Sequence, residues 1–448
     1  MKVLLVSLGC DKNLVDSEVM LGLLHEQKYE MVDDEALAEV IIVNTCSFIQ
    51  SAKEESIATI LELSLYKKQG NCKLLLVCGC LAQRYAKEIR EEIPEVDGII
   101  GSLAYEQITD IISEMLEKQK PVVCLENRQD KQGSNSLKRI LTTGRHYAFL
   151  KIAEGCDKSC AYCIIPTLRG KYTSRELESL LEEAKYLVSQ GVSELILVAQ
   201  ESTMYGVDLY KKKSLPLLLQ KLEEIPDLKW IRLLYCYPEE ITDELIQVMK
   251  HSKKICPYLD MPIQHVNNAM LKKMNRATNK EALQAKIRKL RQEIPGLVLR
   301  TTLITGFPGE TQKEHEEVLA FIQEEKFERL GVFTYSQEEG TKAAEMSGQI
   351  SEERKEKRQE QLMQAQQKIS RDFHTSLVGQ TFEVLIEGKG PEEGVYLGRT
   401  YMDAPDVDGL VFIHTDKLLL SGEYHLVEIC DSSEYDLIGK LVEEKAKG

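Results

Sequence analysis

Three cysteines, Cys156, Cys160 and Cys163, stand close together in the segment GCDKSCAYC. They follow the apolar run 148–153, which we expect to be a strand, so their C-x3-C-x2-C spacing puts three thiols on one loop. Three thiolates on one loop can bind three irons of a [4Fe–4S] cube and leave the fourth iron open. Zinc is the alternative, but a structural zinc site needs a fourth protein ligand, and no neighbouring side chain is well placed to supply it.

A second set of cysteines is scattered along the first eighty residues, where Cys10, Cys46 and Cys80 each end an apolar run: VLLVSLGC, VIIVNTC and LLLVCGC. The carboxyl ends of parallel strands share one edge of a sheet, so we expect these thiols to converge there on a second [4Fe–4S] cluster. Three unrelated buried thiols are the alternative. Cys78 competes with Cys80, which we prefer because it follows Gly79, where the loop begins.

The elements that must position these thiols fall into three regions. In residues 1–126, short apolar runs alternate with helical stretches, which predicts a parallel sheet. Residues 127–146 are polar and predict a linker. Residues 147–375 contain six apolar runs with intervening helices and a charged trailing helix, which indicates a partial (β/α)6 barrel with its chemistry at the carboxyl ends of the strands. Residues 376–442 contain short β runs separated by Gly and Asp, typical of a small antiparallel β-barrel.

Composition narrows the class of protein. The chain has 448 residues, 43% of them hydrophobic and 29% charged, which supports packed domains. No apolar run approaches the roughly 18 residues of a membrane span, so we expect no membrane association and a cytoplasmic location. Thiols stay reduced there, and twelve cysteines therefore indicate metal binding or catalysis. The net charge of −15 disfavours direct nucleic-acid binding and suits a basic partner.

The first cysteine triplet, with Tyr162 directly before Cys163, resembles the signature of the radical S-adenosylmethionine (SAM) superfamily. The resemblance implies that the open iron binds the amino and carboxylate groups of SAM. An electron from the cluster then cleaves the S–C bond, and the resulting 5′-deoxyadenosyl radical abstracts a hydrogen atom. The cofactor carries out this chemistry, while the protein positions it and excludes water. Tyr162 is accordingly placed among the cofactor-binding residues.

Further strand ends are expected to complete the SAM site. The second strand of the barrel ends in VAQE, and the superfamily usually has Gly-Gly-Glu where this sequence has Ala199-Gln200-Glu201. Despite that departure, we assign Gln200 and Glu201 to the SAM ammonium group. A polar pair facing water is the alternative. Arg300 either binds the SAM carboxylate or is a structural arginine. Thr305 and Gly306 either allow close approach of adenine or form a tight turn.

Taken together, the three regions resemble the methylthiotransferases over nearly the whole chain, with a flavodoxin-like N-terminal sheet and a C-terminal TRAM-like barrel. The resemblance implies two [4Fe–4S] clusters and SAM as cofactors, and an electron donor such as a flavodoxin or ferredoxin. The N-terminal cluster would carry the sulfur, while one SAM supplies the methyl group and another the radical. No catalytic side chains beyond the clusters are assigned.

The choice of substrate depends on local sequence motifs and on the charge of the C-terminal region. SLGCDKNLVDSE resembles the branch that methylthiolates the β-carbon of an aspartate in the small-subunit ribosomal protein S-twelve, although that branch usually has Pro where Asp11 stands. Segment 398–409 is also similar to that branch. From residue 376 onward, 6 Lys and Arg face 15 Asp and Glu, which suits docking of a basic ribosomal protein.

Three acidic residues are assigned to that docking, with a solvated turn as the alternative: Asp403, Asp406 and Asp408. The runner-up function is a tRNA adenosine methylthiotransferase, which needs a basic docking face instead. A non-catalytic metal-binding or RNA-binding scaffold represents a different class of protein.

Overall fold

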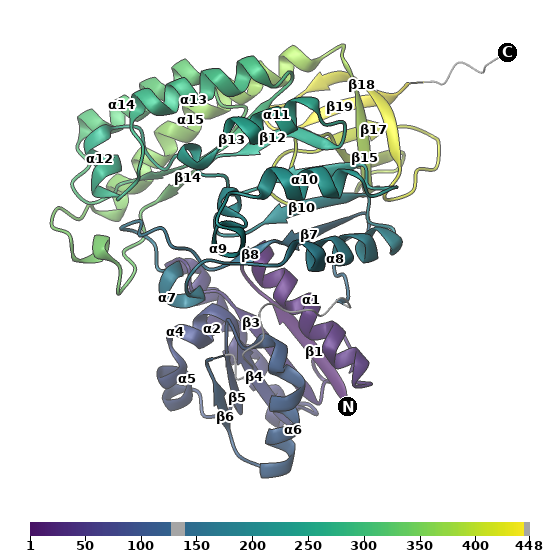
Figure 1. Ribbon diagram of the computed structural model, residues 1–448. Helices are drawn as coiled ribbons and strands as arrows, with labels where there is room; N and C mark the ends of the chain where they lie inside the picture. The colour runs from purple at the N-terminus through teal and green to yellow at the C-terminus, as the bar shows by residue number, and fades with distance from the viewer. Residues whose placement is uncertain (127–138, 443–448) are drawn as a thin grey trace.

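The computed structural model describes residues 1–126 and 139–442, arranged as three packed α/β and β units (Figure 1). Most of the predicted linker, residues 127–138, lies outside the described residues. In Figure 1 the N-terminal unit lies below the central sheet, and the yellow C-terminal barrel lies at the upper right. Within the described ranges, no helix is both long and apolar enough to cross a membrane.

The N-terminal unit is a six-stranded, all-parallel sheet with the strand order β2-β1-β3-β4-β5-β6. Its strands are β1 (Lys2–Ser7), β2 (Glu30–Met31), β3 (Val40–Thr45), β4 (Leu74–Cys78), β5 (Gly98–Gly101) and β6 (Val122–Cys124). This is the flavodoxin-like order, in which the direction of winding reverses between β1 and β3. Ligands bind at such a reversal, outside the carboxyl ends of the strands.

Helices cover both faces of this sheet, because its strands carry apolar side chains on both faces. One face packs against α1 (Asp11–Glu26) and α6 (Ile108–Lys118), and the other against α2 (Gln50–Ser64), α4 (Gly79–Arg84) and α5 (Ala86–Glu92). Burial on both faces explains why the strands read as continuous apolar runs. The short α3 (Tyr66–Gln69) follows α2.

The central unit is a second all-parallel sheet of six strands, which neighbour one another in chain order. They are β7 (Tyr147–Lys151), β10 (Glu194–Val198), β11 (Trp230–Leu233), β12 (Ile255–Asp260), β13 (Val298–Thr305) and β14 (Arg329–Thr334). Sequential parallel strands with helical crossovers form the predicted partial (β/α)6 barrel. Its intervening helices include α8 (Leu177–Ser189), α9 (Val207–Tyr210), α10 (Leu215–Glu223), α11 (Asp243–His251), α12 (Asn268–Lys273), α13 (Lys280–Glu293) and α14 (Gln312–Glu325), and α15 (Glu352–Leu377) follows β14.

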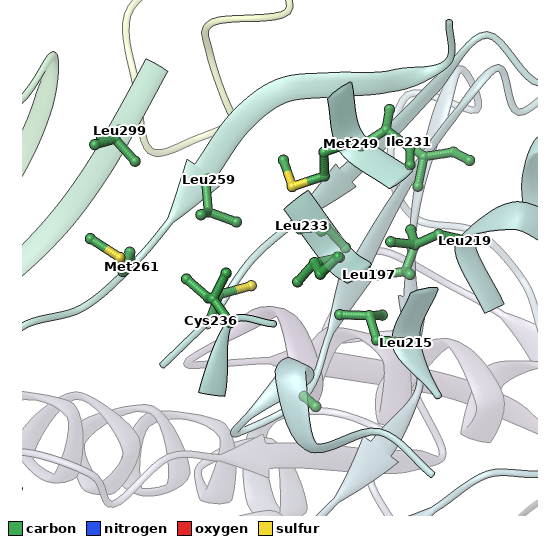
Figure 2. Close-up of a cluster of buried hydrophobic side chains, with 14 of the residues drawn as sticks. Leu197, Leu215, Leu219, Ile231, Leu233, Cys236, Met249, Leu259, Met261 and Leu299 are labelled. Carbon is green, nitrogen blue, oxygen red and sulfur yellow. The ribbon is translucent and has the colours of Figure 1, made fainter. Parts of the chain in front are cut away.

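The core of the central unit lies between the strands and the outer helices. Figure 2 shows strand residues meeting residues of α10 and α11, among them Leu197, Ile231, Leu233, Leu259, Leu215, Leu219 and Met249. Burying each such side chain contributes about 1.5–3 kcal/mol. This apolar layer holds the strands rigid, so that the loops at their carboxyl ends keep a fixed relative position.

The C-terminal unit is a closed five-stranded barrel with the order β15-β16-β17-β19-β18. Its strands are β15 (Thr381–Lys389), β16 (Val395–Arg399), β17 (Val411–His414), β18 (Tyr424–Ser432) and β19 (Leu437–Leu441). All neighbours are antiparallel except β17 and β19, which pair in parallel, so the expected antiparallel barrel is correct for four of its five pairings. The barrel packs on the inner face of the central sheet, where both contribute to one apolar core.

Candidate active site

The N-terminal cysteines follow three neighbouring strands at the reversal of winding. Cys10 precedes the first residue of α1, Cys46 follows β3, and Cys80 lies in the first turn of α4. Gly9 has φ +90°, and a Cβ added there would lie 2.7 Å from the Cβ of Cys46. The loops that bear Cys10 and Cys46 therefore touch, and glycine is needed where they do.

The structure distinguishes Cys78 from Cys80. Cys78 is fully buried in the apolar core beneath α1 and α6, and burial raises the pKa of its thiol far above the usual range. Cys80 instead packs against Ile164 and Leu168, which follow the second cysteine triplet in the chain. Cys78 thus serves packing, and Cys80 lies on the side of the sheet edge that faces the central unit.

The second triplet occupies a loop that is closed at its base. The short strands β8 (Ala153–Glu154) and β9 (Thr173–Ser174) pair in antiparallel fashion on either side of it, and α7 (Ile165–Arg169) lies within it. The Cys163 N–H donates to the Cys160 carbonyl at 3.0 Å, and the Cys160 Sγ lies 3.6 Å from the Tyr237 hydroxyl. Cys160 and Cys163 therefore lie on one tight turn, and Cys156 precedes it on the same loop.

Burial perturbs these thiols, and Tyr162 lies among them. Desolvation raises the pKa of Cys156 to about 11 and that of Cys163 to about 12. Burial likewise raises the pKa of Tyr162, whose neighbours include Arg276 and Cys160. Since iron binds the thiolate form, a metal bound here must displace these protons.

Each triplet offers three cysteine thiols as its donor set. Three thiolates can hold a [4Fe–4S] cube with one iron left open, whereas a closed zinc site requires four ligands around one atom. The donor set of each triplet therefore fits an iron–sulfur cube. Across residues 1–126 and 139–442, no three or more His, Cys, Asp or Glu side chains are grouped to hold a single metal ion.

At the end of β10, two buried polar side chains keep oxygen atoms without partners. The Glu201 Oε1 accepts the N–H of Thr203 at 3.0 Å, while its Oε2 is buried and has no partner among the described residues. Gln200 donates its amide to Glu154 Oε1 at 2.7 Å, and its own Oε1 is likewise buried and without a partner in the described chain. Buried acceptors without partners are costly, so these atoms fit a ligand that donates hydrogen bonds.

The pKa of the Glu201 carboxyl is also shifted by its surroundings. Burial raises the pKa of its carboxyl to about 7, although hydrogen bonds from Thr203 and the charge of Lys158 oppose the shift. Cys156 contributes to the same electrostatic environment, since the Glu201 charge raises the pKa of that thiol. The carboxyl therefore lies near the second cysteine triplet and is poised to ionise beside a cation.

The other predicted SAM contacts have partners within the protein. Arg300 forms ion pairs with Asp260 at 3.2 Å and Asp408 at 3.4 Å. A Cβ on Gly306 would meet the Lys355 side chain at 2.4 Å, so this glycine makes room for α15. Only Thr305 keeps a buried hydroxyl without a partner among the described residues. SAM binding by Arg300 and Gly306 stays a prediction, with a structural role visible for both.

The three aspartates assigned to docking contact the central sheet. Asp403 is 2% exposed and pairs with Arg329 at 2.5 Å. Asp406 accepts the Tyr147 hydroxyl at 3.2 Å, and Asp408 accepts the Tyr258 hydroxyl at 2.7 Å. These contacts join the C-terminal barrel to the sheet, and docking of a substrate by these aspartates stays a prediction.

Comparison with known families divides the chain in the same way. Residues 2–101 match the uncharacterized protein family UPF0004, residues 150–322 the radical SAM superfamily, and residues 378–442 the TRAM domain. A ribosomal protein uS12 methylthiotransferase RimO from Lachnoclostridium phytofermentans is 55% identical over 98% of this chain and 99% of its own length. This chain belongs to the RimO family. Its RimO relative from Clostridioides difficile is 49% identical over 100% of both chains.

Solved structures that share the fold of this RimO family member are more distant in sequence. The radical SAM methyltransferase TsrM from Kitasatospora setae, solved with cobalamin and a [4Fe–4S] cluster, has a TM-score of 0.57 at 13% identity and covers 94% of this chain and 83% of its own. The cobalamin-dependent radical SAM enzyme OxsB has a TM-score of 0.54 at 13% identity and covers 81% of this chain and 56% of its own. These likenesses establish the fold.

Sequence reasoning missed the charged residues that join the two cysteine sites. Lys151, Glu154 and Arg169 from the central unit form a buried cluster with Asp16 of α1. A signal was present, since Lys151 interrupts the otherwise apolar run YAFLKIA. A lysine inside a buried strand needs acidic partners, and here one of them, Asp16, comes from another domain.

Proposed function

We propose that this chain methylthiolates the β-carbon of an aspartate of ribosomal protein uS12. One observation carries the proposal: two cysteine triplets follow the carboxyl ends of strands in two parallel sheets, and Cys80 of one triplet packs on Ile164 and Leu168, which follow the other triplet in the sequence, in a chain of the RimO family. One sheet edge alone would suit one iron–sulfur group. Two facing edges suit a reaction in which two such groups act on the same carbon.

The two triplets take different parts. Cys156, Cys160 and Cys163 would hold one [4Fe–4S] cluster, and the N-terminal triplet of Cys10, Cys46 and Cys80 would hold the other. When bound, these groups and SAM supply the radical, the sulfur and the methyl group. The protein supplies a buried site, since Cys156 and Cys160 are each 7% exposed, which keeps water from the reacting centre.

Polar side chains at the end of β10 orient SAM. Glu201 Oε2 and Gln200 Oε1, which have no hydrogen-bond partner in the described part of the chain, are acceptors that fit the three donors of an ammonium group. The charge of Lys158 favours the ionised form of Glu201. An ion pair with Glu240 fixes the position of the Lys158 ammonium group. Gln200 is fixed by its bond to Glu154, so its free oxygen keeps one direction.

The expected partners follow from the negative charge of the chain and from the need to reduce an iron–sulfur group. The acidic C-terminal barrel and the net charge of −15 complement a basic ribosomal protein. Reduction of an iron–sulfur group requires an electron donor, for which a flavodoxin or ferredoxin in the cytoplasm is suitable.

The test is a mass measurement on two substrates. The chain is purified without oxygen, reconstituted with iron and sulfide, and incubated with SAM, dithionite and either recombinant uS12 or bulk tRNA. We expect uS12 to gain the mass of one sulfur and one methylene at a single aspartate, and tRNA to stay unchanged. The Cys46→Ala variant is the matched control. A gain of mass on tRNA alone would show that the nucleic-acid branch is the right one.

A further inference from the structure

A buried cluster of four charges lies between the two cysteine triplets. Arg169, at the end of α7, donates from Nη1 to Asp16 at 2.8 Å and to Glu154 at 2.9 Å. The Lys151 ammonium binds Glu154 at 2.8 Å and also Asp16. The side chains of Arg169, Asp16 and Lys151 are 2%, 3% and 6% exposed. Two cations thus face two anions, and the cluster is neutral by itself.

The guanidinium of Arg169 also faces the N-terminal thiols. Leu168, which directly precedes Arg169 in the chain, packs against Cys80. The charges of Asp16 and Glu154 are balanced by Arg169 and Lys151. Thiolates at Cys10 and Cys80 would therefore be additional negative charges on the side of Arg169 that faces the N-terminal triplet.

Arg169 is also connected through Asn13 to the loops that carry Cys10 and Cys46. Its Nη2 donates to the Asn13 side-chain oxygen. Asn13 then donates from Nδ2 to the carbonyl of Leu8 at 3.0 Å and to the carbonyl of Thr45 at 3.0 Å. Leu8 lies two residues before Cys10, and Thr45 directly precedes Cys46, so Asn13 connects Arg169 to two of the three loops of the triplet.

Arg169 therefore links two domains at one point. Its backbone belongs to the loop that carries Cys156, Cys160 and Cys163, six residues beyond the last of them in sequence, while its guanidinium lies inside the N-terminal unit. On the other side Glu154 continues the connection to Gln200 at 2.7 Å. Loss of the guanidinium would remove its contacts with Asn13 and Asp16 of the N-terminal unit as well as its contact with Glu154.

We propose that Arg169 is a positioning residue for an iron–sulfur group at the N-terminal triplet, fixing it relative to the second triplet and stabilising its reduced form by positive charge. This rests on the function proposed above. A reduced cluster carries one more negative charge than an oxidised one, so a neighbouring cation raises its reduction potential, as do hydrogen bonds to its sulfurs.

The test isolates the N-terminal cluster in the full-length chain with Cys156, Cys160 and Cys163 all changed to Ala. Its midpoint potential is measured by redox titration with paramagnetic resonance detection, and its iron is counted. We expect Arg169→Met to shift the potential to more negative values, and Arg169→Lys to stay near the parent. Asp16→Asn removes a negative charge from the same cluster and should shift the potential the opposite way.

The matched control is Arg139→Met. Arg139 is also buried between units, where it pairs with Glu18 at 3.5 Å and Glu183 at 3.3 Å. It should leave the potential unchanged. Equal potentials in all variants, or shifts of one sign in Arg169→Met and Asp16→Asn, would overturn the proposal. If Arg169→Met does not fold, the sign of the Asp16→Asn shift decides. A parent that binds no iron would overturn the two-cluster function, and this inference with it.

Discussion

Replacing Glu201 by Gln changes one oxygen into an amide nitrogen and leaves the size of the side chain unchanged. In the structure Oε1 is held by Thr203, and Oε2 is buried without a partner in the described chain. If Oε2 accepts the SAM ammonium group, the variant loses a hydrogen bond between two charged groups, worth about 1.5–3 kcal/mol. That corresponds to about 10- to 150-fold weaker SAM binding.

The assay is equilibrium binding of SAM to the reconstituted chain, with variants compared at equal iron content. A suitable control is Glu183→Gln, because Glu183 is also buried but pairs with Arg175 at 2.6 Å on the outer side of the sheet. It should leave the dissociation constant unchanged. An unchanged dissociation constant in Glu201→Gln would refute the assignment of this carboxylate to SAM.

The same carboxyl predicts a pH dependence. Burial raises the pKa of Glu201 to about 7, so the fraction in the ionised, ammonium-binding form falls as the pH drops from 8 to 6. SAM binding to the parent should therefore weaken as the pH falls through 7. Gln does not titrate, and the Glu201→Gln variant should lose this dependence.

Further variants test the thiols and the domain contacts. Cys156→Ala should abolish release of 5′-deoxyadenosine, and normal release would contradict the radical-forming site. Cys46→Ala should keep that release but yield no methylthiolated product, as judged by mass. Cys80→Ala should lose iron from the N-terminal site, whereas Cys78→Ala should keep it because that thiol lies in the apolar core. Arg399→Met should lower stability by about 3–5 kcal/mol, seen as a lower thermal midpoint, because it leaves buried carboxylates partly unpaired.

The sheets could be predicted because their strands are buried on both faces. Runs such as VIIVNT and ELILV are continuous and apolar, which is typical of parallel strands covered by helices. Convergence of Cys10, Cys46 and Cys80 at one sheet edge follows from that topology alone, since parallel strands end on the same side. The direction of the β17–β19 pairing depends on how the barrel closes, which no local pattern records.

Side-chain partners across domains could not be predicted from local patterns. Arg300 and Asp408 are 108 positions apart in sequence, and their 3.4 Å contact exists only because the C-terminal barrel packs on the inner face of the sheet. Gly306 is similar, because the Lys355 side chain that needs its space comes from α15. Both residues sit at strand positions that also suit a ligand, so a motif alone cannot separate the two roles.

The C-terminal barrel is fastened to several strands of the sheet, among them β7 and β12 through the hydroxyls of Tyr147 and Tyr258. Arg232 of β11 donates to the Tyr401 carbonyl at 2.6 Å, and the pairs Arg300–Asp408 and Arg329–Asp403 add anchors on β13 and β14. Because contacts to several strands fix the orientation of the barrel on the sheet, a substrate bound to the barrel would also reach the site in a fixed orientation. Exchanging this barrel between relatives should therefore succeed only when the strand residues that contact it are exchanged with it.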